Sequence, residues 1–504
     1  MTLDYTPIDA IPKVHKELNE AFTERVSLPI AWRQYQLLQV ARMLQENHQA
    51  FADALNKVCG SFLLWYTVAD INDKDLGRPA HEAYTMEIAP MIDRAISSAK
   101  ALPKWAAPEN KVDDVPDWQK DWRPTVYRTP KGVVLVIAPW NYPVILSIQP
   151  LMGAIAAGCP AVLKPSEVAS NVAAVLAEYI PKYLDNRAYK VVNGGVKETT
   201  KLLELKWDHI FYTGNGTVAR IISAAAAKHL TPMTLELGGK SPVIIDPEVD
   251  LDIAARRVLY GKLSNAGQLC VTPDYIYIPT AKDPDAVKKF VASFKKAVNE
   301  CWPNGSLTSS DFSHIINQNH FKRVDSIISR TKGKVVVGGG KDEETLKMEI
   351  TVVVDIEKDD SVLEGENFGP LIPIVEVKTI EDAVRQIGER DHPLVLYAFT
   401  DNEGTKQYIR DNTMSGAIVY NDTVIQLAVN ELPFGGVGES GYGRQVLRYT
   451  YEAFSYLRTS VDIPYAAEPM LAGRYPPYTK EKWDLMVAPL LNQPIPGSTT
   501  ESGL

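Results

Sequence analysis

Hydrophobic and polar positions along the chain follow two periodicities, one helical and one typical of buried strands. Residues 13–59 carry apolar side chains at helical spacing, for example Leu37, Ala41 and Leu44, and predict helices. After the connector PDWQKDWRPTVYRTP, strand-like runs alternate with helical segments such as NVAAVLAEYIPKYL and VARIISAAAAKHL. The strand-like runs are VVLVIAP, PAVLKPS, YKVVNGG, HIFYTGN and MTLELGG. This alternation predicts a parallel, doubly wound sheet with helices on both faces.

A second alternating series follows the first one along the chain. It consists of DAVKKFVASFKKAV, KVVVGGG, ITVVVDI, PLIPIVEV, TIEDAVRQIGER, LVLYAFT and GAIVYND, and it predicts a second α/β domain. The boundary between the two domains is expected near Gly238 and Gly239. A length of 504 residues leaves room for about three domains.

One apolar stretch has the length of a membrane span. Residues 132–163 contain no charged side chain. Four prolines interrupt this stretch, and a bilayer would leave many of its backbone groups without partners. We therefore interpret it as a strand, a loop, a helix and a strand, all buried within protein. The C-terminal WDLMVAPLLNQPIP is too short to span a bilayer, so a segment that docks on a membrane surface is the alternative.

Composition and charge exclude several classes of protein. Hydrophobic residues make up 45% and charged residues 23%, which is typical of a globular chain. The net charge of −9 and the lack of a basic stripe exclude a nucleic-acid surface. Cys59, Cys159, Cys270 and Cys301 have no metal-like spacing, so we expect free thiols and no metal site. The polar, acidic N-terminus is unlike a signal peptide, and a cytoplasmic protein is expected.

Polar or glycine residues follow the ends of several predicted strands. Open α/β sheets bind ligands beyond the carboxyl ends of their strands. Asn141 follows VVLVIAP, Lys164 and Glu167 belong to PAVLKPSE, Gly214 follows HIFYT, and Glu236 lies in MTLELGG. The sequence therefore predicts that these residues gather at one edge of the first sheet.

The glycine turn after HIFYT matches a dinucleotide-binding fingerprint. Residues 214–219 read Gly-Asn-Gly-Thr-Val-Ala between a predicted strand and a predicted helix, as the G-x-G-x-x-G/A pattern requires. Such a turn lets a pyrophosphate approach backbone N–H groups at a helix N-terminus. An ordinary tight turn is the alternative. The pattern also asks for an acidic residue about twenty positions later, and on this reading Glu236 would bind a ribose.

The remaining motifs each have a structural and a functional interpretation. Asn141 in PWNYP could satisfy a loop backbone, and Lys164 and Glu167 could form a solvated ion pair. EGENFGP, with Glu366 and Phe368, could be a turn, and ELPFGGVGESGYGR could be a flexible loop. Cys270, in LSNAGQLCVTPDYIYIP, lies between a helical and a strand-like pattern. It could be a small core residue or a nucleophile, and residue patterns alone leave both open.

Taken together and in this order, the motifs resemble the aldehyde dehydrogenase superfamily. The motifs are PWNYP, AGCPAVLKPSE, FYTGN, LELGGKSP, GQLC, ENFGP and ELPFGGVGESGYGR. LTPMTLELGGKSP, PFGGVGESGYGR and RYPPYT look most like its class 3 branch, which includes fatty-aldehyde dehydrogenases. The resemblance covers about residues 15–480. The cysteine 34 residues after the glutamate of LELGGKSP (270 − 236) is its most specific feature.

The resemblance implies a role for each motif residue. Cys270 would be the nucleophile, Glu236 the general base and Asn141 the side-chain donor of the oxyanion hole. Glu236 would then not be a ribose ligand. In the phosphate turn, Asn215 stands at the family's usual serine and Ala219 at a later glycine. The implied cofactor-binding residues are Ile137, Pro139, Trp140, Lys164, Glu167, Gly214, Asn215, Gly216, Thr217, Val218, Ala219, Leu237, Gly238, Glu366 and Phe368.

The resemblance also implies the fold, the cofactor and the partners. The fold is expected to have two doubly wound α/β domains, a Rossmann-like NAD-binding one and a catalytic one, plus a small oligomerisation arm. The expected NAD-binding domain is residues 1–237 with a return at 425–454, and the expected catalytic domain is 238–424. The oligomerisation segments would be about 118–130 and 455–475, followed by a C-terminal extension at 476–504.

The implied activity is oxidation of apolar or aromatic aldehydes by a homodimer, with NAD as cofactor and NADP as the alternative. The chain lacks the C-terminal membrane anchor of many fatty-aldehyde relatives, which leaves only peripheral membrane contact. Three alternatives stay open: a relative that transfers its acyl group to coenzyme A, one that reduces acyl phosphates, and a non-catalytic nucleotide-binding scaffold. The first two generally lack the glutamate base.

Overall fold

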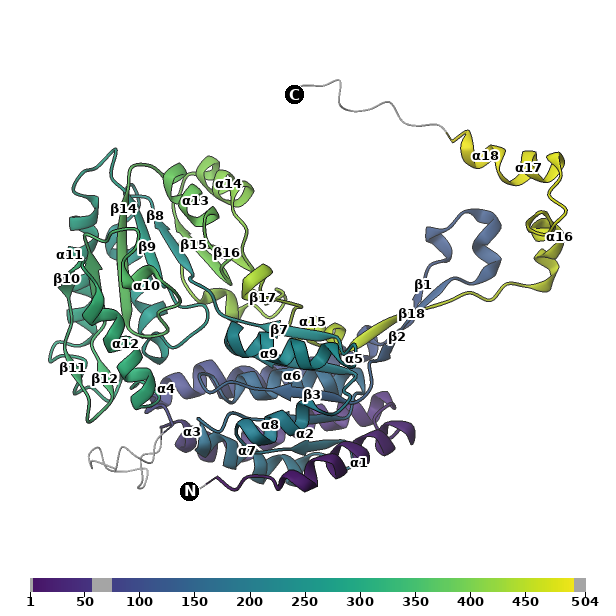
Figure 1. Cartoon of the computed structure of the whole chain (residues 1–504), viewed down its shortest axis with the longest axis horizontal. Helices are drawn as coiled ribbons and strands as arrows, with labels where there is room; N and C mark the ends of the chain where they lie inside the picture. Colours follow the sequence, from purple (N-terminus) through teal and green to yellow (C-terminus); the bar gives the residue numbers. More distant parts are fainter. Residues whose placement is uncertain (1–2, 57–74, 494–504) are drawn as a thin grey trace. The chain divides into compact units, whose positions relative to one another are not determined.

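A computed structural model describes residues 3–56 and 75–493 of the chain (Figure 1). The chain divides into two compact units. Residues 1–105 and 130–455 form the first unit, and residues 106–129 and 456–504 form the second. The predicted helices before the connector are α1 (Ile11–Thr23), α2 (Ile30–Glu46), α3 (His48–Asn56), α4 (Ala80–Ala83), a π-helical turn at Tyr84–Ile88 and α5 (Ala89–Trp105).

The first sheet of the larger unit has six strands in the order β17-β7-β6-β3-β4-β5. All neighbours are parallel except β17, which pairs antiparallel with β7, a departure from the all-parallel prediction. The strands are β3 (Val134–Ile137), β4 (Ala161–Lys164), β5 (Tyr189–Val191), β6 (His209–Thr213), β7 (Met233–Glu236) and β17 (Gly441–Tyr442). The helices between them are α6 (Ile145–Ala157), α7 (Ser170–Tyr183), α8 (Val196–Leu203) and α9 (Gly216–Ala227).

Side chains on both faces of the first sheet are buried. Leu135 and Ile137 of β3 belong to one apolar cluster with Leu202 of α8 and Ile222 of α9. All four residues of β3 are buried, so its other face is also covered, and α6 packs against β3 and β4. The uncharged stretch at 132–163 is therefore β3, a loop, α6 and β4 within the core, as expected.

The second sheet has seven strands in the order β10-β13-β14-β9-β8-β15-β16. Only the edge pair β10 and β13 is antiparallel. The strands are β8 (Pro242–Ile245), β9 (Tyr275–Pro279), β10 (Lys334–Val337), β13 (Thr351–Val354), β14 (Leu371–Val377), β15 (Val395–Phe399) and β16 (Ala417–Tyr420). A small hairpin, β11 (Lys341–Asp342) and β12 (Lys347–Met348), follows β10.

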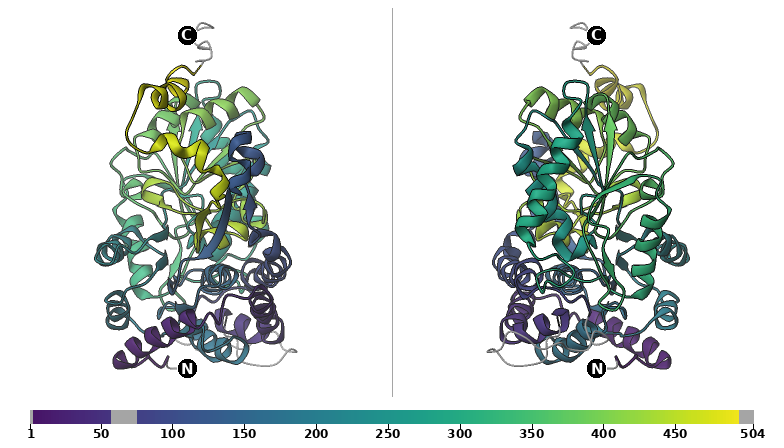
Figure 2. Two further views of the ribbon diagram at one scale, coloured as in Figure 1. Left: turned by 90° about the vertical axis from the view of Figure 1, so that its right-hand side faces the viewer. Right: turned by 90° about the vertical axis from the view of Figure 1, so that its left-hand side faces the viewer.

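Helices cover both faces of the second sheet as well. Val243 and Ile245 of β8 pack in one cluster with α10 (Leu251–Leu263) and α11 (Ala286–Cys301), whereas Ile244 packs in another with α13 (Ile380–Gly388) and α14 (Glu403–Asn412). Alternate strand residues point to opposite faces, so these two helix pairs lie on opposite sides of the sheet. The side views of Figure 2 show them as teal and light-green ribbons. The predicted second α/β series is thus present.

The remaining helices of the larger unit are α12 (Gln318–Arg330) and α15 (Arg448–Ala453). The smaller unit contains a three-stranded sheet in the order β1-β2-β18, with β1 at Glu109–Asn110, β2 at Thr125–Pro130 and β18 at Ser455–Ser460. As far as residue 493, where the described part ends, three short α-helices follow β18: α16 (Glu468–Leu471), α17 (Lys480–Met486) and α18 (Ala488–Leu491). The functional domain boundaries expected from the resemblance stay a prediction.

Candidate active site

A cavity of about 650 Å³ lies in the larger unit, and residues from both sheets line it. The first sheet contributes the loops after β3, β4 and β6 together with the end of β7. The second sheet contributes the loops that precede β9 and β14. The motif residues that line the cavity are Ile137, Pro139, Trp140, Asn141, Lys164, Glu167, Gly214, Asn215, Val218, Glu236, Leu237, Gly238, Cys270, Glu366 and Phe368. Gly216, Thr217 and Ala219, in the first turn of α9, are not among its described lining residues.

Cys270 lies at the junction of two cavities. The half-buried thiol lines the 650 Å³ cavity and also a second cavity of about 390 Å³. Apolar residues make up much of the second wall, among them Leu146, Ile425 and Phe434. Burial, followed by the charges of Glu366 and Glu236, raises the pKa of the Cys270 thiol above that of a free cysteine. The thiol must therefore lose its proton to a nearby base before it can act as a thiolate nucleophile.

Two other described cysteines differ from Cys270 in their surroundings. Cys159 is fully buried, its thiol donates to the carbonyl oxygen of Phe454 at 3.4 Å, and burial raises its pKa to about 11. Cys301 is exposed at the end of α11. Neither lines the two cavities, and Cys59 lies outside the described residues. Cys159 therefore behaves as a small core residue, the structural interpretation of a cysteine.

The carboxyl group of Glu236 is buried without a protein partner. Glu236 is the last residue of β7, where Gly441 of β17 pairs with it, and it is 3% exposed. Within the described part of the chain, neither carboxyl oxygen has a hydrogen-bond partner. Burial raises the pKa of Glu236 well above its ordinary value, and Arg444 opposes the rise only in part. In its ionised form, this cavity-lining carboxylate has both oxygens available and can accept a proton from water or from a thiol.

Asn141 joins the loop after β3 to the loop that carries Cys270. Its Nδ2 donates to the carbonyl oxygen of Gln268 at 3.1 Å. The backbone carbonyl oxygen of Asn141 accepts hydrogen bonds from Arg78 Nη2 at 2.6 Å and from Asn265 Nδ2 at 2.9 Å. An amide Nδ2 carries two N–H groups, so one remains available to a ligand atom near Cys270.

Polar groups suited to a ribose and a phosphate also line the cavity. Lys164 Nζ lies 2.6 Å from Glu167 Oε2, at the end of β4. Asn215 caps α9, because its Oδ1 accepts the backbone N–H of Val218 at 2.9 Å. The amide of Asn215 therefore stabilises the helix end at which the fingerprint expects a phosphate. The exposed apolar side chains of Val196 and Ile221 also line this cavity.

Glu366 and Phe368 line the same cavity as Cys270 and lie on the loop before β14. Burial, followed by the charge of Asp274, raises the pKa of Glu366 to about 8, although the backbone N–H of Gly239 opposes the rise. Its Oε1 is buried without a partner among the described groups. A Cβ on Gly238 would lie 2.2 Å from Glu366 Oε2, which explains a glycine there. Phe368 packs edge-on against Trp140, with ring centroids 5.4 Å apart.

These residues fit a nicotinamide dinucleotide. The cavity offers an ion pair for one ribose, a capped helix N-terminus for phosphate, a buried carboxyl with one unpartnered oxygen for the second ribose, and two aromatic rings in the wall that also contains the thiol. This set matches the donors and acceptors of such a cofactor, and the residues that would hold it are those named above.

The aldehyde dehydrogenase family model matches residues 9–460. The chain belongs to this family. A dog protein described as "Aldehyde dehydrogenase, dimeric NADP-preferring" is 39% identical over 467 residues, which is 93% of this chain and 98% of the relative. A mouse "Aldehyde dehydrogenase family 3 member A2" is 40% identical over 92% of this chain and 91% of its own length. A Staphylococcus aureus structure, "Substrate bound state of Staphylococcus Aureus AldH", matches with a TM-score of 0.87 and 32% identity, covering 95% of this chain and 99% of that one.

Family membership confirms the predicted fold class, the class 3 resemblance and the enzyme activity. The protein is an aldehyde dehydrogenase that oxidises aldehydes with NAD(P). Among the helices of residues 3–56 and 75–493, none is long and apolar enough to cross a membrane.

His320 and Arg323 are among the residues in the wall of this aldehyde dehydrogenase's first cavity that the sequence motifs missed. The ring of His320 is tilted against that of Trp140, with ring centroids 4.8 Å apart. Arg323 donates to the carbonyl oxygens of Asn367 at 2.8 Å and Phe368 at 2.9 Å, and so holds the loop before β14. Both lie on the amphipathic helix α12, and no local motif marks them. The only sequence signal was the apolar period of NHFKRVDSIISR, which does not distinguish a cavity-facing residue from a solvated one.

Proposed function

We propose that this aldehyde dehydrogenase uses Cys270 as its nucleophile, Glu236 as its base and Asn141 as an oxyanion donor, and that it acts on apolar aldehydes. The observation that carries this proposal is the place of Cys270, where the cofactor-sized cavity and the smaller, largely apolar cavity meet. A thiol at such a junction can attack an aldehyde that enters from one cavity beside a cofactor held in the other.

The first step is attack on the aldehyde carbon. Glu236 accepts the thiol proton, the S–C bond forms and the carbonyl π electrons move to oxygen, giving a thiohemiacetal alkoxide on Cys270. The free N–H of Asn141 and the backbone N–H of Cys270 donate to that alkoxide. One such donor is worth about 3 kcal/mol of transition-state stabilisation. Because the pKa of the thiol is raised, its deprotonation by a neighbouring base is an essential part of the step.

Cofactor binding is assigned to the remaining cavity residues. Bound NAD(P) supplies the acceptor for the hydride that leaves the substrate carbon. Lys164 and Glu167 hold the adenosine ribose, and Glu366 accepts hydrogen bonds from the second ribose. Phe368 and Trp140 position the ring beside Cys270 and exclude water. Glu167 favours NAD over NADP, because its carboxylate repels a 2′-phosphate, and NADP remains the alternative, since the dog relative is described as NADP-preferring.

Release of the product requires water. Glu236 first releases the proton of the thiol to solvent and then takes a proton from water; the resulting hydroxide attacks the thioester carbon, and the C–S bond breaks to give the acid and the Cys270 thiolate. This step separates hydrolytic enzymes from relatives that pass the acyl group to coenzyme A or work on acyl phosphates, which generally lack this base. The buried, unpartnered carboxyl of Glu236 supports the hydrolytic reaction.

The walls of the smaller cavity favour apolar substrates. Its volume is about 390 Å³, and Met86, Tyr142, Leu146, Ile425 and Phe434 contribute apolar surface. Arg94 adds a polar group, but its guanidinium already donates to Gln149, Asn430 and the carbonyl oxygen of Leu427. We therefore assign medium-chain, long-chain or aromatic aldehydes as substrates.

We also propose that the enzyme is a cytoplasmic homodimer. The sheet β1-β2-β18 ends in an edge strand, β18, with exposed Tyr456 and Leu457, and edge strands are suited to pairing with another chain. The dog relative is described as dimeric. The free described cysteines favour a reducing compartment. Light scattering is expected to give twice the chain mass of 55.8 kDa, and a monomer would contradict the assembly.

The half of the chain that builds the first sheet is assigned to cofactor binding, and the half that builds the second sheet carries the nucleophile. The C-terminal segment with α16, α17 and α18 exposes Trp483, Leu485 and Leu490. We assign it to peripheral contact with a membrane. Deletion of residues 476–504 is expected to lower kcat/KM for long aldehydes more than for short ones.

Cys270→Ala tests the central assignment. The variant is expected to lose dehydrogenase activity and to bind NAD as the parent does, because the thiol reacts and does not hold the cofactor. Iodoacetamide, followed by peptide mass spectrometry, is expected to label Cys270 in parallel with activity loss, whereas Cys159→Ala keeps both activity and labelling. Residual turnover above about a hundredth of the parent rate would contradict the nucleophile, since removing such a group costs several orders of magnitude.

A further inference from the structure

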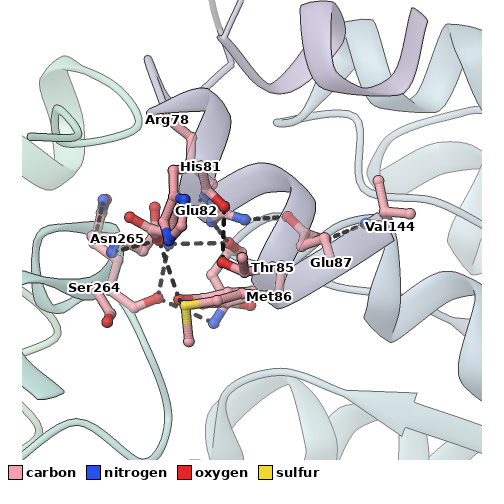
Figure 3. Close-up of polar contacts among 12 residues, drawn as sticks. Arg78, His81, Glu82, Thr85, Met86, Glu87, Val144, Ser264 and Asn265 are labelled. Carbon is pink, nitrogen blue, oxygen red and sulfur yellow. Dashed lines mark hydrogen bonds and ion pairs between the residues drawn. The ribbon is translucent and has the colours of Figure 1, made fainter. Parts of the chain in front are cut away.

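A buried arginine lies next to the loop that carries Asn141. Arg78 has no exposed surface, and it pairs with Glu87 through Nη1 and with Glu82 through Nε at 3.5 Å. Its guanidinium carbon lies 4.2 Å from the centre of the Tyr142 ring. Figure 3 shows Arg78 reaching toward both glutamates, which lie on the helical segment that begins two residues after it. No motif singled out this cluster.

Each glutamate extends the cluster to a different loop. Glu87 Oε2 accepts the backbone N–H groups of Val144 at 2.7 Å and Ile145 at 3.0 Å, at the start of α6 (Figure 3). Glu82 Oε1 accepts the backbone N–H of Asn265 at 2.8 Å. The first contact holds the end of the loop that contains Asn141. The second holds the loop that leads to Cys270.

The two loops meet at the carbonyl oxygen of Asn141. Arg78 Nη2 and Asn265 Nδ2 both donate to it, at 2.6 and 2.9 Å. Asn265 Nδ2 also lies 3.1 Å from the carbonyl oxygen of Gln268, which is the acceptor of Asn141 Nδ2. Asn265 has φ 49°, a left-handed backbone that asparagine tolerates better than most residues. The peptide of Asn141 is thus fixed by donors from two other segments.

We propose that Arg78 is a positioning residue for catalysis: it fixes the Asn141 peptide, and thereby aims the Asn141 amide at the oxyanion that forms on Cys270. The inference rests on the proposed function of Asn141. Arg78 does not line either cavity among the described residues, so it acts through Asn141 and not on substrate. Catalytic donors act only when they are held in place before the charge develops.

The variant Arg78→Lys tests whether the geometry of the guanidinium group matters in addition to its positive charge. Arg78→Lys keeps a cation for Glu87 but loses the planar fork that reaches Glu87, Glu82 and the Asn141 carbonyl together. The rate of the NADH burst is expected to fall about 10- to 100-fold, the size of effect that a shift of about 1 Å can produce. The KM for aldehyde and the Kd for NAD are expected to change less than about 3-fold, since neither ligand contacts Arg78.

Arg33→Lys is the matched control. Arg33 also donates to a backbone carbonyl, that of Ala156 at 2.8 Å, and it lines neither cavity. This control is expected to lose thermal stability while keeping the parent burst rate. Equal losses of burst rate in the two variants would show that Arg78 acts through general stability only, and would overturn the proposal.

A double-mutant cycle with Asn141→Ala decides whether Arg78 acts through Asn141. If it does, Arg78→Lys lowers the burst rate of the parent but changes that of Asn141→Ala by less than about 2-fold, whereas the melting temperature falls equally in both backgrounds. Multiplicative losses of burst rate would overturn the positioning role. A parent-like burst in Asn141→Ala would instead contradict the oxyanion assignment of the proposed function, and the two failures are thereby distinguished.

Asn265→Gly keeps the test available if Arg78→Lys does not fold. Glycine accepts φ 49°, so this change removes the other donor to the Asn141 carbonyl with little backbone strain. The burst rate is expected to fall about 10-fold in the parent background and to stay the same in Asn141→Ala. A parent-like burst in Asn265→Gly, or a further loss in Asn141→Ala, would contradict the idea that donors to this carbonyl aim the amide.

Discussion

The ammonium group of Lys164 lies 2.6 Å from Glu167 Oε2, at the carboxyl end of β4 and in the wall of the larger cavity. The lysine side chain is 6% exposed and the glutamate side chain 30% exposed. The largely buried lysine therefore holds the more exposed carboxylate of Glu167 in place at the cavity wall. A neutral ribose can donate hydroxyl groups to that carboxylate, but a ribose phosphate would bring like charges together.

Glu167→Gln is expected to reduce the preference for NAD over NADP. The amide removes the repulsion of the 2′-phosphate and leaves an acceptor for the ribose, so kcat/KM for NADP should rise about 10-fold relative to NAD, a shift of about 1.4 kcal/mol. Steady-state rates with each cofactor measure the ratio. Glu204→Gln is the matched control, because Glu204 pairs with Lys201 at the same sequence spacing and lies outside the cavity. An unchanged ratio in Glu167→Gln would contradict the ribose assignment.

For straight-chain aldehydes, kcat/KM is expected to increase with the number of carbon atoms until the aldehyde fills the smaller cavity. Each methylene removed from water contributes about 0.8 kcal/mol, or about 4-fold. Ile425→Asp places a charge in the cavity wall and should lower kcat/KM for long aldehydes far more than for short ones. Met414→Asp is the control, since Met414 is exposed and outside the cavity. Equal losses for long and short aldehydes in Ile425→Asp would argue against this cavity as the substrate site.

Local periodicity predicted the two α/β series well, because strands buried on both faces need continuous apolar runs and surface helices need one apolar stripe. The residues VLVI and YIYIP form β3 and β9, with every side chain buried. The strand β17 was not predicted, and β10, predicted as a strand from KVVVGGG, was not predicted to run antiparallel to its neighbour. Strand direction depends on where the chain returns, and β17 returns to β7 from about 200 residues away in sequence.

The rule that ligands lie beyond strand carboxyl ends predicted only the half of the site that the first sheet supplies. Asn141, Lys164 and Glu236 follow or end β3, β4 and β7, as expected. Cys270 and Glu366 instead precede β9 and β14, at the amino ends of neighbouring strands in the other sheet. Only the resemblance to a family connected these residues with the first group. The Arg78 cluster depends on packing between three distant segments, which no pattern in the sequence encodes.

Glu366 is expected to make stability depend on pH in the neutral range. Its pKa is raised from 4.5 to about 8, chiefly by burial, so the folded protein holds this proton more tightly than the unfolded chain does. That stabilisation is complete below about pH 4.5 and is lost as the pH rises through about 8. Glu366→Gln lacks this dependence. The melting temperature of the parent minus that of the variant, without cofactor, should therefore fall between pH 5 and pH 8.

Glu364→Gln supplies the control for this pH series. A hydrogen bond from Arg330 lowers the pKa of exposed Glu364 below its ordinary value of 4.5. Glu364 therefore stays largely ionised from pH 5 to pH 8. The melting-temperature difference for Glu364→Gln should stay constant between pH 5 and pH 8. A constant difference for Glu366→Gln as well would show that Glu366 is ionised throughout this range in the folded protein.

Glu236→Gln separates the roles of a water-activating base and a ribose ligand. The amide cannot take a proton from water at neutral pH, so thioester hydrolysis should stall after hydride transfer. We expect a burst of NADH that approaches one equivalent per active site, followed by turnover at least about 100-fold slower than in the parent. The same glutamate also accepts the thiol proton, so the burst itself should be slower. Stopped-flow absorbance measures both phases.

Intact-protein mass spectrometry of the stalled Glu236→Gln enzyme is expected to show one added acyl group, and peptide mapping is expected to place it on Cys270. The double variant with Cys270→Ala is the control and should show neither the burst nor the added mass. A ribose ligand would behave differently: Glu236→Gln would bind NAD more weakly but turn over at the parent rate once NAD is saturating. That outcome would contradict the base assignment, and the buried, unpartnered carboxyl at the end of β7 would then belong to the cofactor site.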